Sequence, residues 1–238
     1  MHNIFKKKIG LIILVRSGSK RLPKKCFKKI NKKPLLSYVY ERCLKIINKK
    51  NIVIATTKLK EDDQIYRFSK KNKIKCFRGS NNNLFKRFYD CTKFYGFDYS
   101  IRVNADSPLI NFNEISKSLI HIKNKKYEII TNSLIKTFPK GMAVEIISKK
   151  AMFKANKLIK TSFDKMHVTT FFYSNKKKFK IKNISNKKKY TYCKNLSVDT
   201  IDDFKLISFI YKKMKYKIIN LTLKKYDSII RNYYNESI

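Results

Sequence analysis

The sequence predicts an α/β protein in which a mostly parallel sheet lies between two layers of helices. Residues 9–15 form a continuous apolar run, the pattern of a strand buried on both faces of a sheet. Patterns typical of helices and strands then alternate along the chain with short connections. The 238 residues show no convincing linker and no internal repeat, so we expect a single domain spanning residues 1–238.

The expected elements follow from the spacing of apolar residues. The expected strands are residues 9–15, 52–56, 73–78, 98–103, 128–132, 142–147, 179–184 and 193–198. The expected helices, with apolar residues every three or four positions, are residues 34–47, 61–71, 84–95, 113–123, a segment after Ser148, 164–173, 200–214 and 223–232. Ligands of such sheets lie beyond the carboxyl ends of the parallel strands, so the loops after Val15, Thr56, Arg78 and Val103 form the candidate site.

The chain is strongly basic, with 57 Lys and Arg against 16 Asp and Glu and a formal charge of +41. Such a surface can bind nucleic acid or an anionic membrane. However, residues with A/T-rich codons (Lys, Ile, Asn, Phe and Tyr) are abundant together, whereas Gly, Pro and Trp are scarce, which indicates a bias in genome composition. The lysines are also scattered along the chain. We therefore expect no nucleic-acid partner, although the charge would attract a polyphosphate substrate.

Cysteine and histidine usage favours a reduced, cytoplasmic protein without a zinc site. The five cysteines are an odd number and form no C-x-x-C pair, and only three histidines occur. Three lysines before residues 9–15 imitate a signal peptide, but the apolar run is short, meets Arg16 directly and has no cleavage site after it. No segment is long enough to span a membrane, so we expect no membrane partner.

The segment RSGSKRLPKK, residues 16–25, follows the first predicted strand. A loop in this position can direct backbone N–H groups at a phosphate, and Gly18 permits close approach of the backbone. Arg16, Arg21 and Lys25 would add positive charge against a triphosphate. The segment is neither a P-loop nor a G-x-G-x-x-G loop. Chemistry alone leaves two interpretations open, a phosphate-binding loop and a basic surface turn.

This segment begins an ordered series of motifs along nearly the whole chain. The motifs are RSGSKRLPKK at 16–25, KPLL at 33–36, IVIATT at 52–57, RGSNNNLFKR at 78–87, RVNADSPL at 102–109, FPKGMAVE at 138–145, HVT at 167–169 and VDTIDD at 198–203. The combination resembles the cytidylyltransferases that activate acidic and related sugars. The spore-coat-polysaccharide type is the nearest subgroup, and the CMP-sialic acid and CMP-Kdo synthetases are related to it.

The resemblance implies a fold, a reaction and a set of site residues. The fold is the Rossmann-like one of nucleotide-diphospho-sugar transferases, and the reaction is transfer of CMP from CTP to a sugar with release of pyrophosphate. A homodimer and Mg²⁺, held by Asp106 and Asp199, are also implied. The residues implied are Arg16, Arg21, Lys25 and Asp106 in catalysis; Ser17, Gly18, Ser19, Arg78, Gly79, Ser80 and Ala105 in nucleotide binding; and Glu145 and His167 in binding the sugar.

Structural roles compete with several of these assignments. Asp106 could form an Asx-turn. Asp199 or Thr200 could cap a helix, since Thr200-x-x-Asp203 resembles a capping box. Arg102 could be a buried ion-pair partner as easily as a ligand.

The chain also departs from the family pattern at several positions. Lys24 replaces a usual Gly, Asn83 replaces a frequent Asp, and Lys165-Met166 stands where Arg-Glu is common. These departures leave open which sugar is the acceptor and whether the activity is retained.

Two further function classes compete with a cytidylyltransferase. One is a glycosyltransferase that uses a nucleotide-sugar, but the chain has no Asp-x-Asp metal motif. The other is a basic nucleic-acid-binding protein, which a salt-dependent shift assay would reveal.

Overall fold

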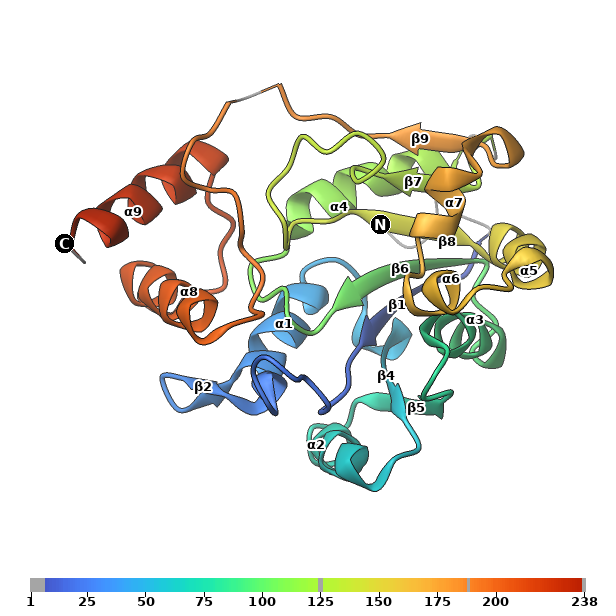
Figure 1. Cartoon of the computed structure of the whole chain (residues 1–238), viewed down its shortest axis with the longest axis horizontal. Coiled ribbons are helices and arrows are strands. Elements are labelled where there is room, and N and C mark those ends of the chain that lie inside the picture. Colours follow the sequence, from blue (N-terminus) through green and yellow to red (C-terminus); the bar gives the residue numbers. More distant parts are fainter. Residues whose placement is uncertain (1–6, 124–125, 188, 237–238) are drawn as a thin grey trace.

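The protein is described from a computed structural model, which covers residues 7–123, 126–187 and 189–236. A seven-stranded sheet runs through it in the order β5-β4-β1-β6-β8-β7-β9 (Figure 1). These strands are β1 (Ile9–Leu14), β4 (Ile52–Thr57), β5 (Lys75–Gly79), β6 (Tyr99–Asn104), β7 (Ile129–Thr131), β8 (Glu145–Ser148) and β9 (Ile181–Asn183). A separate short hairpin pairs β2 (Lys29–Ile30) with β3 (Lys33–Pro34).

The sheet is mostly parallel, as predicted. Strands β5, β4, β1 and β6 run in one direction, and Ile13 of β1 lies between Ile54 and Val103 of its two neighbours. Strand β8 pairs with both β6 and β7 in the antiparallel sense, and β9 continues parallel to β7. The carboxyl ends of the four parallel strands therefore meet at one edge of the sheet, where the predicted site residues follow them.

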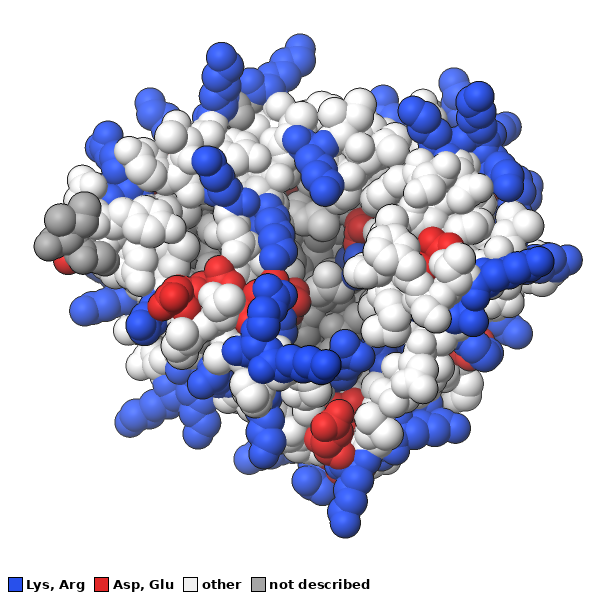
Figure 2. All heavy atoms as spheres, viewed as in Figure 1, with Lys and Arg blue, Asp and Glu red and all other residues white. Residues whose placement is uncertain are grey.

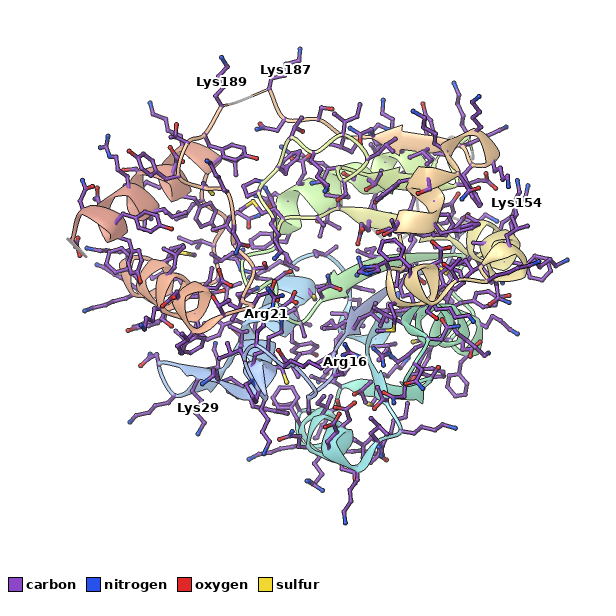
Figure 3. The ribbon with its side chains drawn as sticks, viewed as in Figure 1. Arg16, Arg21, Lys29, Lys154, Lys187 and Lys189 are labelled. Carbon is purple, nitrogen blue, oxygen red and sulfur yellow. The ribbon has the colours of Figure 1, made fainter. Side chains whose placement is uncertain are left out.

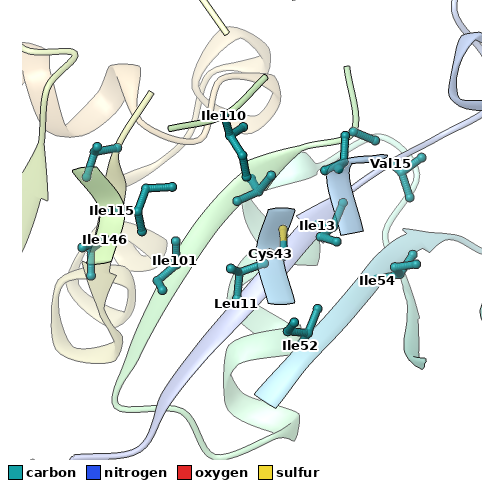
Figure 4. Close-up of a cluster of buried hydrophobic side chains, with 14 of the residues drawn as sticks. Leu11, Ile13, Val15, Cys43, Ile52, Ile54, Ile101, Ile110, Ile115 and Ile146 are labelled. Carbon is teal, nitrogen blue, oxygen red and sulfur yellow. The ribbon is translucent and has the colours of Figure 1, made fainter. Parts of the chain in front are cut away.

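Helices cover both faces of the sheet and produce the expected three layers. Their bounds are α1 (Leu35–Leu44), α2 (Asp63–Lys71), α3 (Leu84–Phe94), α4 (Phe112–Ser118), α5 (Lys149–Leu158), α6 (Ser162–Met166), α7 (Thr170–Ser174), α8 (Ile201–Lys213) and α9 (Leu223–Asn235). On one face, side chains of α1, α2 and α4 pack against alternate residues of the strands, among them Leu11, Ile13 and Ile101 (Figure 4). On the other face, α3, α5 and α7 pack against the intervening residues such as Ile12 and Leu14.

A third apolar cluster attaches the end of the chain to α1. Leu35 and Tyr38 of α1 are buried against side chains of α8 and α9, with the Tyr38 and Tyr211 rings 4.2 Å apart. Arg42 of α1 lies within the same region, where Tyr211 and the carbonyl groups of Ile110 and Ile219 accept its hydrogen bonds. The segment before α8 is thereby returned to the carboxyl edge of the sheet.

The structure corrects the prediction that residues 193–198 form a strand. Its apolar side chains, Cys193, Leu196 and Val198, are buried in the third cluster rather than in the sheet. The segment makes an isolated bridge between Lys140 and Asn195 and is otherwise irregular. Burial on one side of an extended chain produces the same alternation as a strand, which explains the error.

Two other differences concern short elements. The helix expected over residues 164–173 is divided into α6 and α7, because the backbone of His167 leaves the helical region. The β2–β3 hairpin was not expected, since its strands are two residues long and carry little pattern.

None of the helices in the described part of the chain is long and apolar enough to cross a bilayer.

Candidate active site

A cavity of about 660 Å³ opens at the carboxyl edge of the parallel strands. Figure 2 shows the hollow near the centre of the view, with basic and acidic side chains together at its margin. Several predicted residues line it, and the structure brings these together from separate segments of the chain: Arg16, Gly18, Ser19, Arg21, Lys25, Ala105, Asp106, His167 and Asp199. The predicted residues outside the lining are Ser17, Arg78, Gly79, Ser80 and Glu145.

The loop after β1 is closed by the backbone of Ser17. Its carbonyl oxygen accepts hydrogen bonds from the N–H groups of Ser19 and Lys24, at 2.8 and 3.3 Å. Arg16 and Arg21 extend from this loop on the side of the central opening (Figure 3). Lys24 has φ 51° and ψ 30°, a left-handed conformation that glycine adopts most readily. The Gly of the family pattern is thus explained by the backbone at this position.

A buried carboxylate, Asp62, fixes the start of the same loop. The backbone N–H of Ser17 donates to Asp62 Oδ1 at 2.6 Å, and the hydroxyl of Thr57 donates to Asp62 Oδ2. Burial alone would raise the pKa of Asp62, but the hydrogen bonds from Thr57 and Ser17 lower it below its usual value. Ser17 therefore anchors the loop through its backbone rather than facing the cavity.

Lys25 joins the two aspartates that were predicted to bind Mg²⁺. Its Nζ lies 2.9 Å from Asp106 Oδ2, 2.9 Å from Asp199 Oδ1 and 2.8 Å from the carbonyl oxygen of Val198. Burial alone would lower the pKa of Lys25, but the charges and hydrogen bonds of the two carboxylates raise it above its usual value. The ammonium group is thus held in place at the junction of β1, β6 and the segment before α8.

Asp199 is surrounded by cations. Besides Lys25, its Oδ2 lies 2.6 Å from Lys140 Nζ and 3.3 Å from Arg21 Nη2. Burial alone would raise the pKa of Asp199, but its hydrogen bonds with Lys140 and Lys25 and their charges lower it to about 2. The capping function belongs to Thr200 and Asp203, which form a complete capping box at α8, so the Asp199 carboxylate stays available to cations.

The Asp106 carboxylate pairs with a cation instead of closing a turn. Its described partners are Lys25 Nζ and the Ser107 hydroxyl, which donates to Oδ1 at 3.1 Å. The Asp106 carbonyl accepts the Val198 N–H at 2.7 Å, which joins the loop after β6 to the segment that carries Asp199. Among the described residues, however, no group of three or more His, Cys, Asp or Glu side chains is arranged to hold a metal ion.

Arg78, Gly79 and Ser80 lie behind the cavity wall. Arg78 donates to the carbonyl oxygen of Thr57 at 2.9 Å and pairs with Asp63 at 2.7 Å. A Cβ at Gly79 would lie 2.7 Å from the Phe77 side chain and 3.0 Å from the Arg87 side chain, so any larger residue would require these side chains to shift. The carbonyl oxygen of Ser80 accepts a hydrogen bond from Arg87, which itself lines the cavity.

Glu145 also supports a residue of the lining. Its carboxylate is buried, pairs with Arg102 and accepts a hydrogen bond from the Thr169 hydroxyl at 2.7 Å. Arg102 lines the cavity, so this arginine is at once an ion-pair partner and a wall residue. His167 is exposed at the cavity margin, with its ring 4.4 Å from that of Phe163.

A second cavity, of about 340 Å³, adjoins the first at Asn104 and Asp106. Its other polar lining residues are Ser107, Asn132, Ser133, Lys136, Lys140 and Ser197. Residues with hydroxyl and ammonium groups thus line a space that meets the first cavity at Asp106.

Comparison with known proteins identifies the family. The family model described as cytidylyltransferase matches residues 11–232. The chain belongs to the cytidylyltransferase family. A cytidylyltransferase structure from Leptospira borgpetersenii superposes with a TM-score of 0.86 at 27% identity and covers 96% of each chain.

Two further proteins are similar to this chain. The spore coat polysaccharide biosynthesis protein SpsF of Bacillus subtilis is 23% identical over 86% of this chain and 87% of its own. The structure of a CMP:2-keto-3-deoxy-manno-octonic acid synthetase complexed with CTP has a TM-score of 0.64 at 14% identity and covers 87% of this chain and 99% of that one. The last likeness concerns the fold alone. Together with the Leptospira structure, it agrees with the expected fold of the nucleotide-diphospho-sugar transferases.

Family membership fixes the general chemistry. The chain is a nucleotidyltransferase of the cytidylyltransferase type.

Three wall residues were not assigned to the site from the sequence alone. Lys140 lies inside one of the family motifs but was given no role, and its contact with Asp199 bridges residues far apart in the chain. Arg87 and Arg102 also lie inside these motifs. Their position inside the motifs is the sequence signal that they share, but Arg78 shares it too and lies behind the wall.

Proposed function

We propose that this cytidylyltransferase transfers CMP from CTP to a hydroxyl group of an acidic, nonulosonic-type sugar, for the synthesis of a surface polysaccharide or glycan. The sugar oxygen would form a bond to the α-phosphorus while the bond between that phosphorus and the α–β bridging oxygen breaks. Pyrophosphate leaves with the electron pair, and the hydroxyl proton passes to solvent or a base. The observation that supports this most is the cluster of Lys25, Asp106 and Asp199 at the carboxyl edge of the sheet.

The loop after β1 supplies the cations for the triphosphate. Arg16, Arg21 and Lys25 line one cavity, and the backbone of Gly18 and Ser19 lies beside them. Catalysis of phosphoryl-type transfer depends mainly on positioning and on neutralising charge, so fixed cations are the groups that the reaction needs. Lys25 is the best positioned, because two carboxylates and a carbonyl oxygen hold its ammonium group.

The same carboxylates are suitable ligands for magnesium. Mg²⁺ in such enzymes is bound through one or two carboxylates, with substrate phosphates and water as the other ligands. Asp106 and Asp199 provide two carboxylates that already share one cation. When bound there, the ion would neutralise charge on the phosphates of CTP.

The second cavity is our candidate for the acceptor site. It meets the nucleotide cavity at Asp106, so an acceptor hydroxyl in it would be adjacent to the phosphates. Lys136 and Lys140 suit a carboxylate on the sugar, and Ser107, Ser133 and Ser197 suit its hydroxyl groups. Glu145 acts through Arg102, and His167 lies at the margin of the first cavity, where a large sugar could reach it.

A sugar panel tests this assignment. The purified protein is incubated with CTP, Mg²⁺ and single sugars, either acidic or neutral, and pyrophosphate release is measured together with the product mass. We expect release with at least one acidic sugar, a product heavier by one CMP, and loss of activity when the metal is chelated. Activity on neutral sugars alone would contradict the acidic acceptor, and activity in the presence of chelator would contradict the metal.

A further inference from the structure

We propose that Arg87 recognises the cytosine base of CTP and gives the enzyme its preference for CTP over UTP. This inference rests on the proposed function. It concerns the part of the cavity wall that follows β5, which the loop after β1 does not form. Among the described residues, Arg87 is a buried cation with few partners.

Arg87 is buried, with 2% of its surface exposed, yet it forms no salt bridge with any described residue. In the described part of the chain its guanidinium donates one hydrogen bond, from Nη1 to the Ser80 carbonyl oxygen at 3.2 Å. Its Nε is buried and has no partner among the described residues. The pKa of Arg87 is lowered to about 10, mainly because the side chain is buried. The negative charge of Asp62 raises this pKa, whereas the positive charge of Arg16 lowers it further.

A buried cation with few hydrogen-bond partners costs free energy that a ligand can recover. Arg87 lines the 660 Å³ cavity, so the ligand of that cavity is the available source of acceptors. Five N–H groups and no acceptor make a guanidinium suited to a group that presents two adjacent acceptors.

The surrounding sequence holds Arg87 in this position. The absence of a side chain at Gly79 leaves room for the Arg87 stem, and the Ser80 carbonyl accepts from its head. The Asn83 side chain caps α3 by accepting the Lys86 N–H at 2.7 Å, which fixes the first turn of the helix that carries Arg87. The R-G-S segment thus acts on the nucleotide through Arg87.

The location within the cavity favours a base over a phosphate. Arg87 lines the wall together with Asn81 and Leu84, which come from the same loop and helix start after β5. Leu14 adds a second apolar residue to this wall, suited to a flat ring. Lys25 and Arg21, by contrast, contact Asp199 beside the loop after β6.

The donor pattern of Arg87 distinguishes the two pyrimidines. Cytosine presents O2 and N3 as neighbouring acceptors, whereas N3 of uracil carries a hydrogen and is a donor. A guanidinium can donate to both acceptors of cytosine, but it meets a donor at N3 of uracil. Sites built on such hydrogen bonds reject the mismatched analogue strongly, since its polar groups are left unpaired.

Calorimetric titration with CTP and with UTP, in the absence of a sugar, tests the inference. We expect the wild-type protein to bind CTP more tightly than UTP by about ten- to a hundredfold. Arg87→Gln should reduce CTP affinity by a similar factor and remove most of the preference. Arg87→Lys, which keeps the charge and loses the paired donors, should also lose preference. Arg67→Gln, at an exposed position of α2, is the matched control and should change neither affinity.

The outcomes separate the inference from the function on which it rests. If Arg87→Gln weakens CTP and UTP equally, Arg87 contacts a phosphate and the inference is overturned. It is also overturned if the variant keeps its preference for CTP, because Arg87 is then structural. If Arg87→Gln does not fold, Arg87→Lys decides by the same comparison. A wild-type protein that binds neither nucleotide would contradict the proposed function itself.

Discussion

At the scale of single residues, Lys25 is the side chain that joins the two aspartates of the candidate site. Its ammonium contacts two carboxylates and a carbonyl oxygen that come from different parts of the sequence. Without Lys25, the two carboxylates would lose the ammonium group that they share. The triphosphate would also lose a fixed positive charge.

Replacement of this lysine should therefore affect catalysis strongly. We expect Lys25→Met to lower kcat/KM by about 100- to 1,000-fold, the usual cost of removing one fixed donor at a site of developing charge. Lys29→Met is the control, because Lys29 is exposed and points away from the cavity at the margin of Figure 3. An equal loss of activity in the two variants would refute a special role for Lys25.

Lys24 offers a test of backbone strain in the same loop. A residue with a Cβ in the left-handed conformation costs about 1 to 2 kcal/mol relative to glycine. Lys24→Gly should thus be more stable than Lys24→Ala by about 1 kcal/mol in denaturant unfolding, since the two variants differ only in the Cβ. Equal stability would show that the loop relaxes without cost in the alanine variant.

At the scale of elements, α8 positions the site through its first turn. Asp203 Oδ2 accepts the N–H groups of Asp199 and Thr200, at 2.9 and 2.8 Å, and Oδ1 accepts the Asn195 side chain at 2.8 Å. One capping carboxylate thus holds the helix end and the backbone of Asp199 at once.

Loss of this cap should reduce both stability and activity. Asp203→Ala should lower the free energy of unfolding by about 1 to 2 kcal/mol and also reduce kcat/KM, because Asp199 loses its backbone support. The control is Asp202→Ala in the same turn, where the side chain is exposed and its described ion pair is with Lys205 at 3.3 Å. If Asp203→Ala lowers the free energy of unfolding but leaves kcat/KM unchanged, the cap stabilises α8 without positioning Asp199 for the reaction.

Helices and strands were predicted well from the sequence where buried residues recur at the spacing typical of a helix or a strand. The strands buried on both faces and the amphipathic helices were correct within a few residues. The segment at 193–198 was wrong because a buried irregular chain shows the same alternation as a strand. The β2–β3 hairpin is too short to leave a pattern.

The candidate site was predictable in outline for a similar reason. Sheet topology places loops after parallel strands together, so the order of strands and motifs along the chain is enough to associate Lys25 with Asp106. Which motif residues face the cavity depends on side-chain direction, which sequence spacing does not specify. Gly79 and Ser80 therefore turned out to lie behind Arg87.

At the scale of the whole molecule, the charge is spread over the surface and not confined to the site. Lysines and arginines surround the whole visible face in Figure 2. A group of lysines also lines a groove beside the start of β6 and of α5, away from the carboxyl edge of the parallel strands. The distribution agrees with a compositional origin of the +41 charge.

This general charge should nevertheless speed the capture of CTP. Electrostatic attraction is screened beyond about 10 Å at 0.1 M salt and about 3 Å at 1 M. We expect kcat/KM for CTP to fall about tenfold or more between low and high salt, while kcat at saturation changes little. A kcat/KM that does not respond to salt would show that the surface charge contributes nothing to association.

In the proposed reaction, CMP passes from CTP to the acceptor while pyrophosphate leaves. Its most direct test uses CTP labelled at the α-phosphate in one reaction and at the γ-phosphate in another, with the acidic sugar that supports turnover. The α label should appear in the sugar product and the γ label in pyrophosphate. A sugar that acquires the γ label, or an α label that remains in CDP, would contradict the account.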